Sequence, residues 1–281
     1  MKLQISNPTP GQVFYIDALG RMPELRFEAC LLNSQNQPMH APLQWTLQIT
    51  ENIWPGACAS AKLGRQVVQL QGTSVGLGIW IPVFNAHCGG DAILTVTAQY
   101  QGEDYQASVH FKIRGKNPAS DAVVEYIGGE LAPLTWLARF VSGLNQFDIQ
   151  GMPLSGKHGA VGIMQLCNPA AQPHQRWSWV HNVQAGMSLL QRQQGNAKAY
   201  LNQHRLDGDA GRLTAMPTTM QTAHPNANQY PNSESLSDDQ VLLREILQRF
   251  LGDAYWQWDE NIGQWRPNPP DDSVAEVLRL K

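Results

Sequence analysis

Residues 159–166 read GAVGIMQL, and they stand at the centre of the most informative window of the chain, which runs from Arg139 to Gly186. On the N-terminal side of this stretch the apolar residues recur every three or four positions, which predicts a helix that ends near Gly143: Leu134, Leu137, Ala138 and Val141. On its C-terminal side we predict a longer helix over about residues 182–204. The window is therefore framed by helices.

Two further helices are predicted outside the window. Ser120 is placed to cap a short helix that carries Val123, Val124 and Ile127. Residues 237–240 read SDDQ, which has the spacing of a capping box and precedes apolar residues with helical spacing: Val241, Leu242, Ile246, Leu247 and Phe250. Residues 207–235, rich in Asn, Thr, Pro and Gly, are predicted to form a long loop. A compact helical domain is expected to close the chain.

The first 115 residues alternate instead with a period of two, which is typical of half-buried strands. Four such faces are Leu25 to Leu31, Leu43 to Ile49, Ala92 to Ala98 and Val109 to Ile113. Gln101-Gly102 is predicted to join residues 92–100 and 105–113 into a hairpin. About seven short strands favour an immunoglobulin-like (Ig-like) β-sandwich.

Residues 114–119, RGKNPA, interrupt both patterns and mark a boundary. We expect an Ig-like β-sandwich domain at 1–115 and a mainly α-helical domain at 116–281.

Composition excludes several functions. The chain has 281 residues, a net charge of −3, 42% hydrophobic and only 15% charged residues, with no cluster of Lys and Arg. A protein that binds nucleic acid needs a basic surface, so we expect no nucleic-acid partner. The N-terminus has no apolar run typical of a signal peptide, and no stretch is long enough for a membrane span. We expect synthesis in the cytoplasm, with delivery to the periplasm only by a secretion apparatus that needs no signal peptide.

The residues that most often bind metals and cofactors are scattered. The eight histidines show no ligand spacing, and the four cysteines form no C-x-x-C pair. We therefore expect no metal and no cofactor. The cysteines are expected as buried thiols, and the spacing leaves a bridge between Cys58 and Cys88 open.

The window resembles the lysozyme-like catalytic domain of soluble lytic transglycosylases. That family has Glu-Ser-Gly on a helix, then Gly-(Leu/Ile)-Met-Gln, then a helix with Asn-(Ile/Val)-x-x-Gly. The corresponding segments here are Val141-Ser142-Gly143, residues 162–165, and Asn182 to Gly186, and the similarity covers roughly residues 120–280. The resemblance implies a lysozyme-like fold and peptidoglycan as the ligand.

The chain departs from this family where the chemistry occurs. The family's glutamate protonates the glycosidic oxygen, and Val141 stands in its place with no proton to give. The family's Tyr-Asn-Gly turn is replaced by Leu251-Gly252-Asp253. Glu245 and Asp148 are the candidates for a displaced acid, ahead of Glu125 and Glu130.

The remaining motif residues have two interpretations. The resemblance implies contact with glycan for eight of them: Ser142, Gly162, Ile163, Met164, Gln165, Asn182, Tyr255 and Trp256. The alternative is that the glycines and apolar residues pack the domain. The tryptophans are open to the same two interpretations, since they can stack on sugar rings or lie in the core: Trp177, Trp179, Trp256, Trp258 and Trp265.

The sequence therefore favours a catalytically degenerate lytic-transglycosylase-like protein that binds peptidoglycan glycan strands or a protein partner. An Ig-like domain before such a domain, without a signal peptide, is similar to cell-wall effectors of type VI secretion systems. One alternative is an active muramidase or transglycosylase with a displaced acid. Another is an adaptor, immunity or inhibitor protein built on a pseudoenzyme fold.

Overall fold

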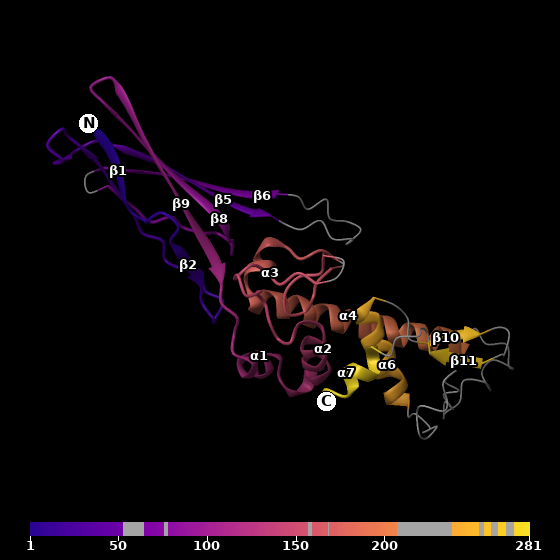
Figure 1. Cartoon of the computed structure of the whole chain (residues 1–281). Helices are drawn as coiled ribbons and strands as arrows, with labels where there is room; N and C mark the ends of the chain where they lie inside the picture. Colours follow the sequence, from indigo (N-terminus) through magenta and orange to yellow (C-terminus); the bar gives the residue numbers. More distant parts are fainter. Residues whose placement is uncertain are drawn as a thin grey trace. The chain divides into compact units, whose positions relative to one another are not determined.

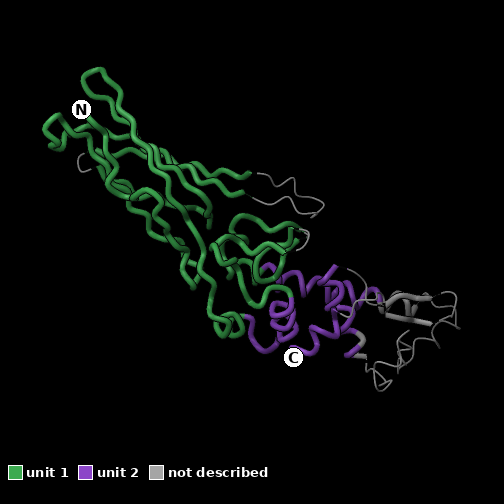
Figure 2. Tube along the Cα trace, in the orientation of Figure 1, with its two compact units in different colours: residues 1–126, 141–184 green, residues 127–140, 185–281 purple. Residues whose placement is uncertain are grey.

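The computed structural model describes residues 1–52, 65–75, 78–156, 159–167, 169–206, 238–252, 256–259, 264–267 and 273–281. These residues combine β-sheets with helices, so the fold is of mixed α and β class. They group into two compact units, shown in green and purple in Figure 2. Unit 1 contains residues 1–126 and 141–184, and unit 2 contains residues 127–140 and 185–281.

Unit 1 contains two β-sheets (Figure 1). The larger sheet has the strand order β2 (Val13–Ile16), β9 (Glu103–Gly115), β8 (Gly90–Tyr100), β5 (Leu43–Asn52) and β6 (Arg65–Ser74). Its pairs are antiparallel except that β2 runs parallel to β9. In the smaller sheet β3 (Phe27–Leu32) pairs with β1 (Lys2–Asn7), β4 (Pro38–Met39) and β7 (Ile79–Trp80).

The strands follow the period of two in the sequence. Along β5 the residues from Leu43 to Ile49 that were predicted to face inward are buried, and the polar residues between them face outward. β8 and β9 pair as predicted through the turn Gln101-Gly102, where both residues have positive φ values of 53° and 84°. The predicted faces in 25–31, 43–49, 92–98 and 109–113 are confirmed.

The core shared by the two sheets extends beyond residue 115, the expected end of the first domain. Phe147 and Trp177 belong to the same buried cluster as the strand residues. The backbone passes so close to them that a Cβ atom at Gly89 would lie 2.4 Å from Trp177, and one at Gly115 would lie 2.2 Å from Phe147. The two rings thus fill space that only glycine leaves open.

Residues 114–119 are held against this later segment as well. The Asn117 side chain accepts the N–H groups of Gln146 and Phe147 at 2.8 and 2.7 Å and donates to the Phe147 carbonyl oxygen at 2.8 Å. The observed units therefore differ from the expected division at 115/116, because the segment 141–184 packs with the strands.

The predicted helices are present. Unit 1 contains α1 (Ser120–Ile127) up to Tyr126, α3 (Pro173–Trp177) and the first residues of α4 (Trp179–Leu206). Unit 2 contains the 3-10 turn η1 (Gly129–Leu131), α2 (Ala132–Ser142) up to Phe140, the rest of α4, α6 (Asp238–Leu251) and α7 (Ser273–Leu278). It also contains the antiparallel pair β10 (Trp256–Asp259) and β11 (Gln264–Pro267). The loop predicted over 207–235 and Ser237 of the capping box lie outside the described residues.

The buried apolar residues of unit 2 follow helical spacing. Leu134, Leu137 and Ala138 are fully buried on α2, and Ile246 and Leu247 are buried on α6. Among the described residues, no helix combines the length and the apolar character that a bilayer crossing requires.

Candidate functional site

The end of α2 carries Val141-Ser142-Gly143, which the resemblance led us to expect at the place of the catalytic Glu-Ser-Gly. Val141 is half-buried in the last turn, and the helix ends because Gly143 and Leu144 adopt φ values of 62° and 64°. The Ser142 hydroxyl donates a hydrogen bond to the Ile163 carbonyl oxygen at 2.7 Å. The helix end is thereby tied to the GAVGIMQL stretch, and the side chain at position 141 has no proton to transfer.

Gly162 allows the chain to turn within that stretch. Its φ is 79°, a conformation that costs other residues about 1–2 kcal/mol. A Cβ atom there would also lie 2.5 Å from the Asn182 amide nitrogen and 2.7 Å from the Gln146 amide. Position 162 therefore requires glycine both for its backbone conformation and for the space around it.

The two amides that surround Gly162, those of Gln146 and Asn182, have no exposed surface. Gln146 donates to the carbonyl oxygens of Gln175 and Arg176 and accepts the Ile163 N–H at 3.1 Å. Asn182 accepts the Met164 N–H at 2.8 Å and donates to the carbonyl oxygens of Val161 and Gln175. Because an unsatisfied buried amide costs about 1–3 kcal/mol, these bonds hold the turn in one geometry.

The predicted glycan-binding residues are thus mostly internal. Ile163, Met164 and Asn182 are buried, so their side chains present no surface to a glycan, and Gly162 is enclosed by amides. Gln165 is partly exposed, but its amide donates to the Gly162 carbonyl oxygen at 2.8 Å. These residues pack the segment, which is the alternative that the sequence left open.

The predictions for the aromatic residues near the C-terminus concern a part of the chain of which less is described. Tyr255 lies outside the described residues, and for Trp256, Trp258 and Trp265 only their places in β10 and β11 are described. In unit 1 the interpretation of the tryptophans as core residues is confirmed for Trp177 and Trp179, which are 0% and 5% exposed.

Both candidate acids make hydrogen bonds within their own segments. Asp148 accepts the N–H groups of Gln150 and Met152 at 2.8 and 3.0 Å and holds a turn. Glu245, in unit 2, is fully buried and accepts from Arg249 at 2.6 Å. Glu125 and Glu130 are exposed, on α1 and η1. Asp148 is the single acidic residue in the sequence of 141–184.

A buried ion pair that the sequence did not predict links β5 to α3. Arg176 donates from Nε and Nη2 to the two carboxylate oxygens of Glu51, each at 2.8 Å. A signal for one partner was present, because the inward period of Leu43, Trp45, Leu47 and Ile49 continues to position 51. Its partner lies 125 residues away, and no local pattern predicts it.

Three histidines that the sequence leaves scattered are brought together beside a hollow of about 470 Å³. The ring of His181 lies 5.2 Å from those of His87 and His174, and His87 and His181 line the hollow with Arg21, Met22 and Phe84. Burial lowers the pKa of His181, and the charges of His87 and His174 lower it further. The described residues contain no group of three His, Cys, Asp or Glu placed to hold a metal ion.

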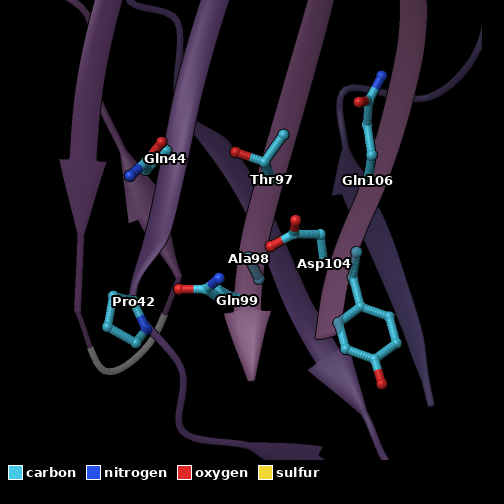
Figure 3. A pocket seen from close by; sticks show the side chains of 8 residues that line it. Pro42, Gln44, Thr97, Ala98, Gln99, Asp104 and Gln106 are labelled. Atoms are coloured by element: carbon cyan, nitrogen blue, oxygen red, sulfur yellow. The ribbon is translucent and has the colours of Figure 1, made fainter. Parts of the chain in front are cut away.

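A larger hollow, of about 730 Å³, lies on the outer face of the five-stranded sheet. Figure 3 shows the residues that line it from neighbouring strands, with the side chains of Gln44, Thr97 and Gln106 beside one another. A second hollow of about 430 Å³ lies next to it and shares Gln44. The sequence did not predict these two hollows, although the polar residues that alternate with the buried ones along β5, β8 and β9 indicate an outward polar face.

The cysteines differ in state. Cys88 is a buried free thiol, and Cys30 is a half-buried free thiol. The bridge between Cys58 and Cys88 that the spacing left open is therefore wrong, and Cys58 itself lies outside the described residues. Cys167 is disulfide-bonded.

Neither the protein-family models nor the curated proteins provide a match to this chain.

Proposed function

We propose that this chain is a non-catalytic, lysozyme-like protein that binds the glycan strands of peptidoglycan. One observation carries the proposal: the helix end that the resemblance assigns to the general acid bears Val141, and Asp148, the single acid of 141–184, accepts two backbone N–H groups of its own turn through Oδ1. Glycosidase chemistry needs a titratable group at the leaving oxygen. Such a group is lacking at this position.

The arrangement of segments supports the lysozyme-like part of the proposal. A helix ends at Ser142, a turn-rich segment with isolated bridges between Ser155 and Val161 and between Val161 and Leu166 follows, and α4 then brings Asn182 against that segment. The order is the one that the resemblance implies.

The strand order supports an Ig-like N-terminal part. The sheet β9-β8-β5-β6 has the order G-F-C-C′ of variable-type immunoglobulin domains, and Trp45 on β5 corresponds to the buried tryptophan of strand C. Cys30 is a free thiol, so it forms no inter-sheet disulfide of the kind found in antibody domains.

The test combines binding and chemistry in one sample. Purified sacculi are incubated with the full chain, sedimented, and the supernatant is analysed by mass spectrometry for 1,6-anhydromuropeptides. We expect the chain in the pellet and no anhydro products, with microcrystalline cellulose as the control that leaves the chain in solution. Release of anhydro products would contradict the non-catalytic assignment, and a chain that stays in solution with sacculi would contradict glycan binding.

A further inference from the structure

At the end of the five-stranded sheet where Gln44 lies, two neighbouring rows of the outer face consist of uncharged polar side chains. One row across four strands contains Thr73, Gln44, Thr97 and Gln106, which are register partners in turn. The next row contains Gln71, Thr46, Thr95 and Ser108. These eight residues are Gln, Thr or Ser, and none carries a charge.

The two hollows follow the first of these rows. Gln44, Thr97 and Gln106 line the larger hollow, whereas Gln44, Thr46, Gln71 and Thr73 line the smaller one. Since neighbouring strands lie about 4.8 Å apart, a row of four spans roughly 14 Å, which is enough for several sugar rings in an extended chain. The hollows thus form a groove that runs across the strands, and we call it the sheet groove.

The hydrogen-bonding groups of the groove are available. Within the described part of the chain, no hydrogen bond is made by the side chains of Gln44, Gln99 or Gln106. Each carboxamide offers two N–H donors and one carbonyl acceptor. The amides of Gln146 and Asn182 differ, because they are buried and form hydrogen bonds with the backbone.

The ring of Tyr105 faces the other side of the sheet from the groove amides, because Tyr105 is the register partner of buried Ala98 and packs against the core. Tyr105 is half-buried and lines the larger hollow beside Asp104 and Pro42. Its hydroxyl donates to a Glu103 carboxylate oxygen at 2.6 Å, which restrains the ring. The groove therefore offers a glycan its polar side chains and no aromatic ring of Tyr105.

We propose that the sheet groove binds a linear chain of β-linked N-acetylhexosamine residues. A phosphate polymer is disfavoured because neither row contains Lys or Arg, and Asp104 stands at one end. The carboxamides of Gln44 and Gln106 match the acetamido groups of such a glycan, donor to acceptor and acceptor to donor. This inference rests on the proposed function and gives it a site separate from the helix end at Val141.

The experiment compares two pairs of glutamine substitutions in the full chain. The groove variant is Gln44→Ala with Gln106→Ala, and the control is Gln4→Ala with Gln35→Ala, which changes two exposed glutamines outside the groove. Binding of soluble chitohexaose and cellohexaose is measured by isothermal titration calorimetry, binding of sacculi by sedimentation, and folding by thermal melts.

We expect the wild-type and control chains to bind chitohexaose, and the groove variant to bind it about tenfold more weakly with an unchanged Tm, because two hydrogen-bonding groups are lost. Unchanged affinity of the groove variant, or absence of chitohexaose binding by the wild type, would overturn the inference. Equal affinity for cellohexaose would overturn the assignment to N-acetylated sugars. If sacculi bind all three chains equally, the proposed function stands without the groove, whereas failure of the wild type to bind sacculi contradicts the proposed function.

Discussion

Arg176 and Glu51 form a buried two-pronged ion pair, with two N–H groups of the guanidinium on the two oxygens of one carboxylate. Arg176 is 1% and Glu51 7% exposed, and Arg176 also donates to the Ala171 carbonyl oxygen and the Gln66 amide oxygen. The pair joins a strand to residues that follow it by more than a hundred positions. The loss of stability when this pair is broken therefore tests whether segment 141–184 and the strands fold as one structure.

Glu51→Gln should lower the free energy of unfolding by about 3–5 kcal/mol, because it leaves a buried guanidinium without its counter-charge. Urea denaturation monitored by tryptophan fluorescence measures the loss and should show a single transition for unit 1. Glu28→Gln, which breaks the exposed pair with Arg26, serves as the control and should cost at most about 1 kcal/mol. Equal losses in the two variants would show that the buried pair does not join the two segments.

Gly162→Ala should destabilise the protein more than Gly102→Ala. Both glycines have positive φ, 79° and 84°, so each substitution has a backbone cost of about 1–2 kcal/mol. A Cβ atom meets nothing within 4 Å at Gly102 but overlaps the amides of Asn182 and Gln146 at Gly162. Chemical denaturation should therefore show an additional loss of at least about 1 kcal/mol for Gly162→Ala. Equal costs would mean that the amides move aside freely.

Val141→Glu should not restore glycan cleavage. A carboxylate at the C-terminal end of α2 faces the negative end of the helix dipole, and the Ser142 hydroxyl beside it is bound to the Ile163 carbonyl oxygen. A general acid in working geometry contributes about 10²–10⁴ in rate, so its return would be detected as anhydromuropeptides by mass spectrometry. Val141→Gln is the matched control. Robust cleavage by Val141→Glu alone would show that the site lacks only its acid.

Acidification should destabilise unit 1 through His181. Its pKa is lowered in the folded chain by burial and by His87 and His174, whereas an unfolded histidine titrates near 6.5. Below about pH 6.5 the unfolded chain binds a proton that the folded chain resists, so the free energy of unfolding falls as the pH falls. His181→Gln should flatten this dependence between pH 7.5 and 5.5, whereas His40→Gln, at an exposed position, should leave it as in the wild type. An unchanged slope in His181→Gln would refute the prediction.

Cys88 should resist alkylation in the folded chain. Burial, with a smaller effect of the Glu51 charge, raises the pKa of its thiol to about 12, and the reactive species is the thiolate. Peptide mapping after iodoacetamide treatment at pH 8 should show Cys88 unmodified in the native protein and modified in urea. Cys167 should stay unmodified in both until a reductant is added, because it is disulfide-bonded. Rapid native labelling of Cys88 would contradict its burial.

Local patterns predicted the elements but not their grouping. The period of two identified the inward faces of β5, β8 and β9, and helical spacing identified α2 and α6, since each pattern depends on neighbours within one element. Phe147 and Trp177 carry no such signal, because their partners are strand residues far away in the sequence. A boundary at 115/116 was inferred from RGKNPA, yet Asn117 in that segment binds the backbone of residues 146 and 147.

The candidate site shows the same limit. The glycine at 162 and the amide at 182 were recognised as important, but a sequence cannot distinguish an amide that binds a glycan from one that binds its own backbone. In the structure the Asn182 side chain is buried and its amide binds backbone groups of Met164 and Val161. The outward glutamines of the sheet were visible as polar positions in the alternation, and only the register of β5, β8 and β9 placed Gln44, Thr97 and Gln106 in one row.

The late position of Phe147 and Trp177 has a consequence for biosynthesis. The last strand of the sheets ends at Gly115, but Trp177, which completes their core, follows about 60 residues later. At a translation rate of about 5–20 residues per second, the nascent strands wait roughly 3–12 s on the ribosome with an apolar surface uncovered. During that interval the emerging chain offers chaperones a binding surface that the finished protein no longer has.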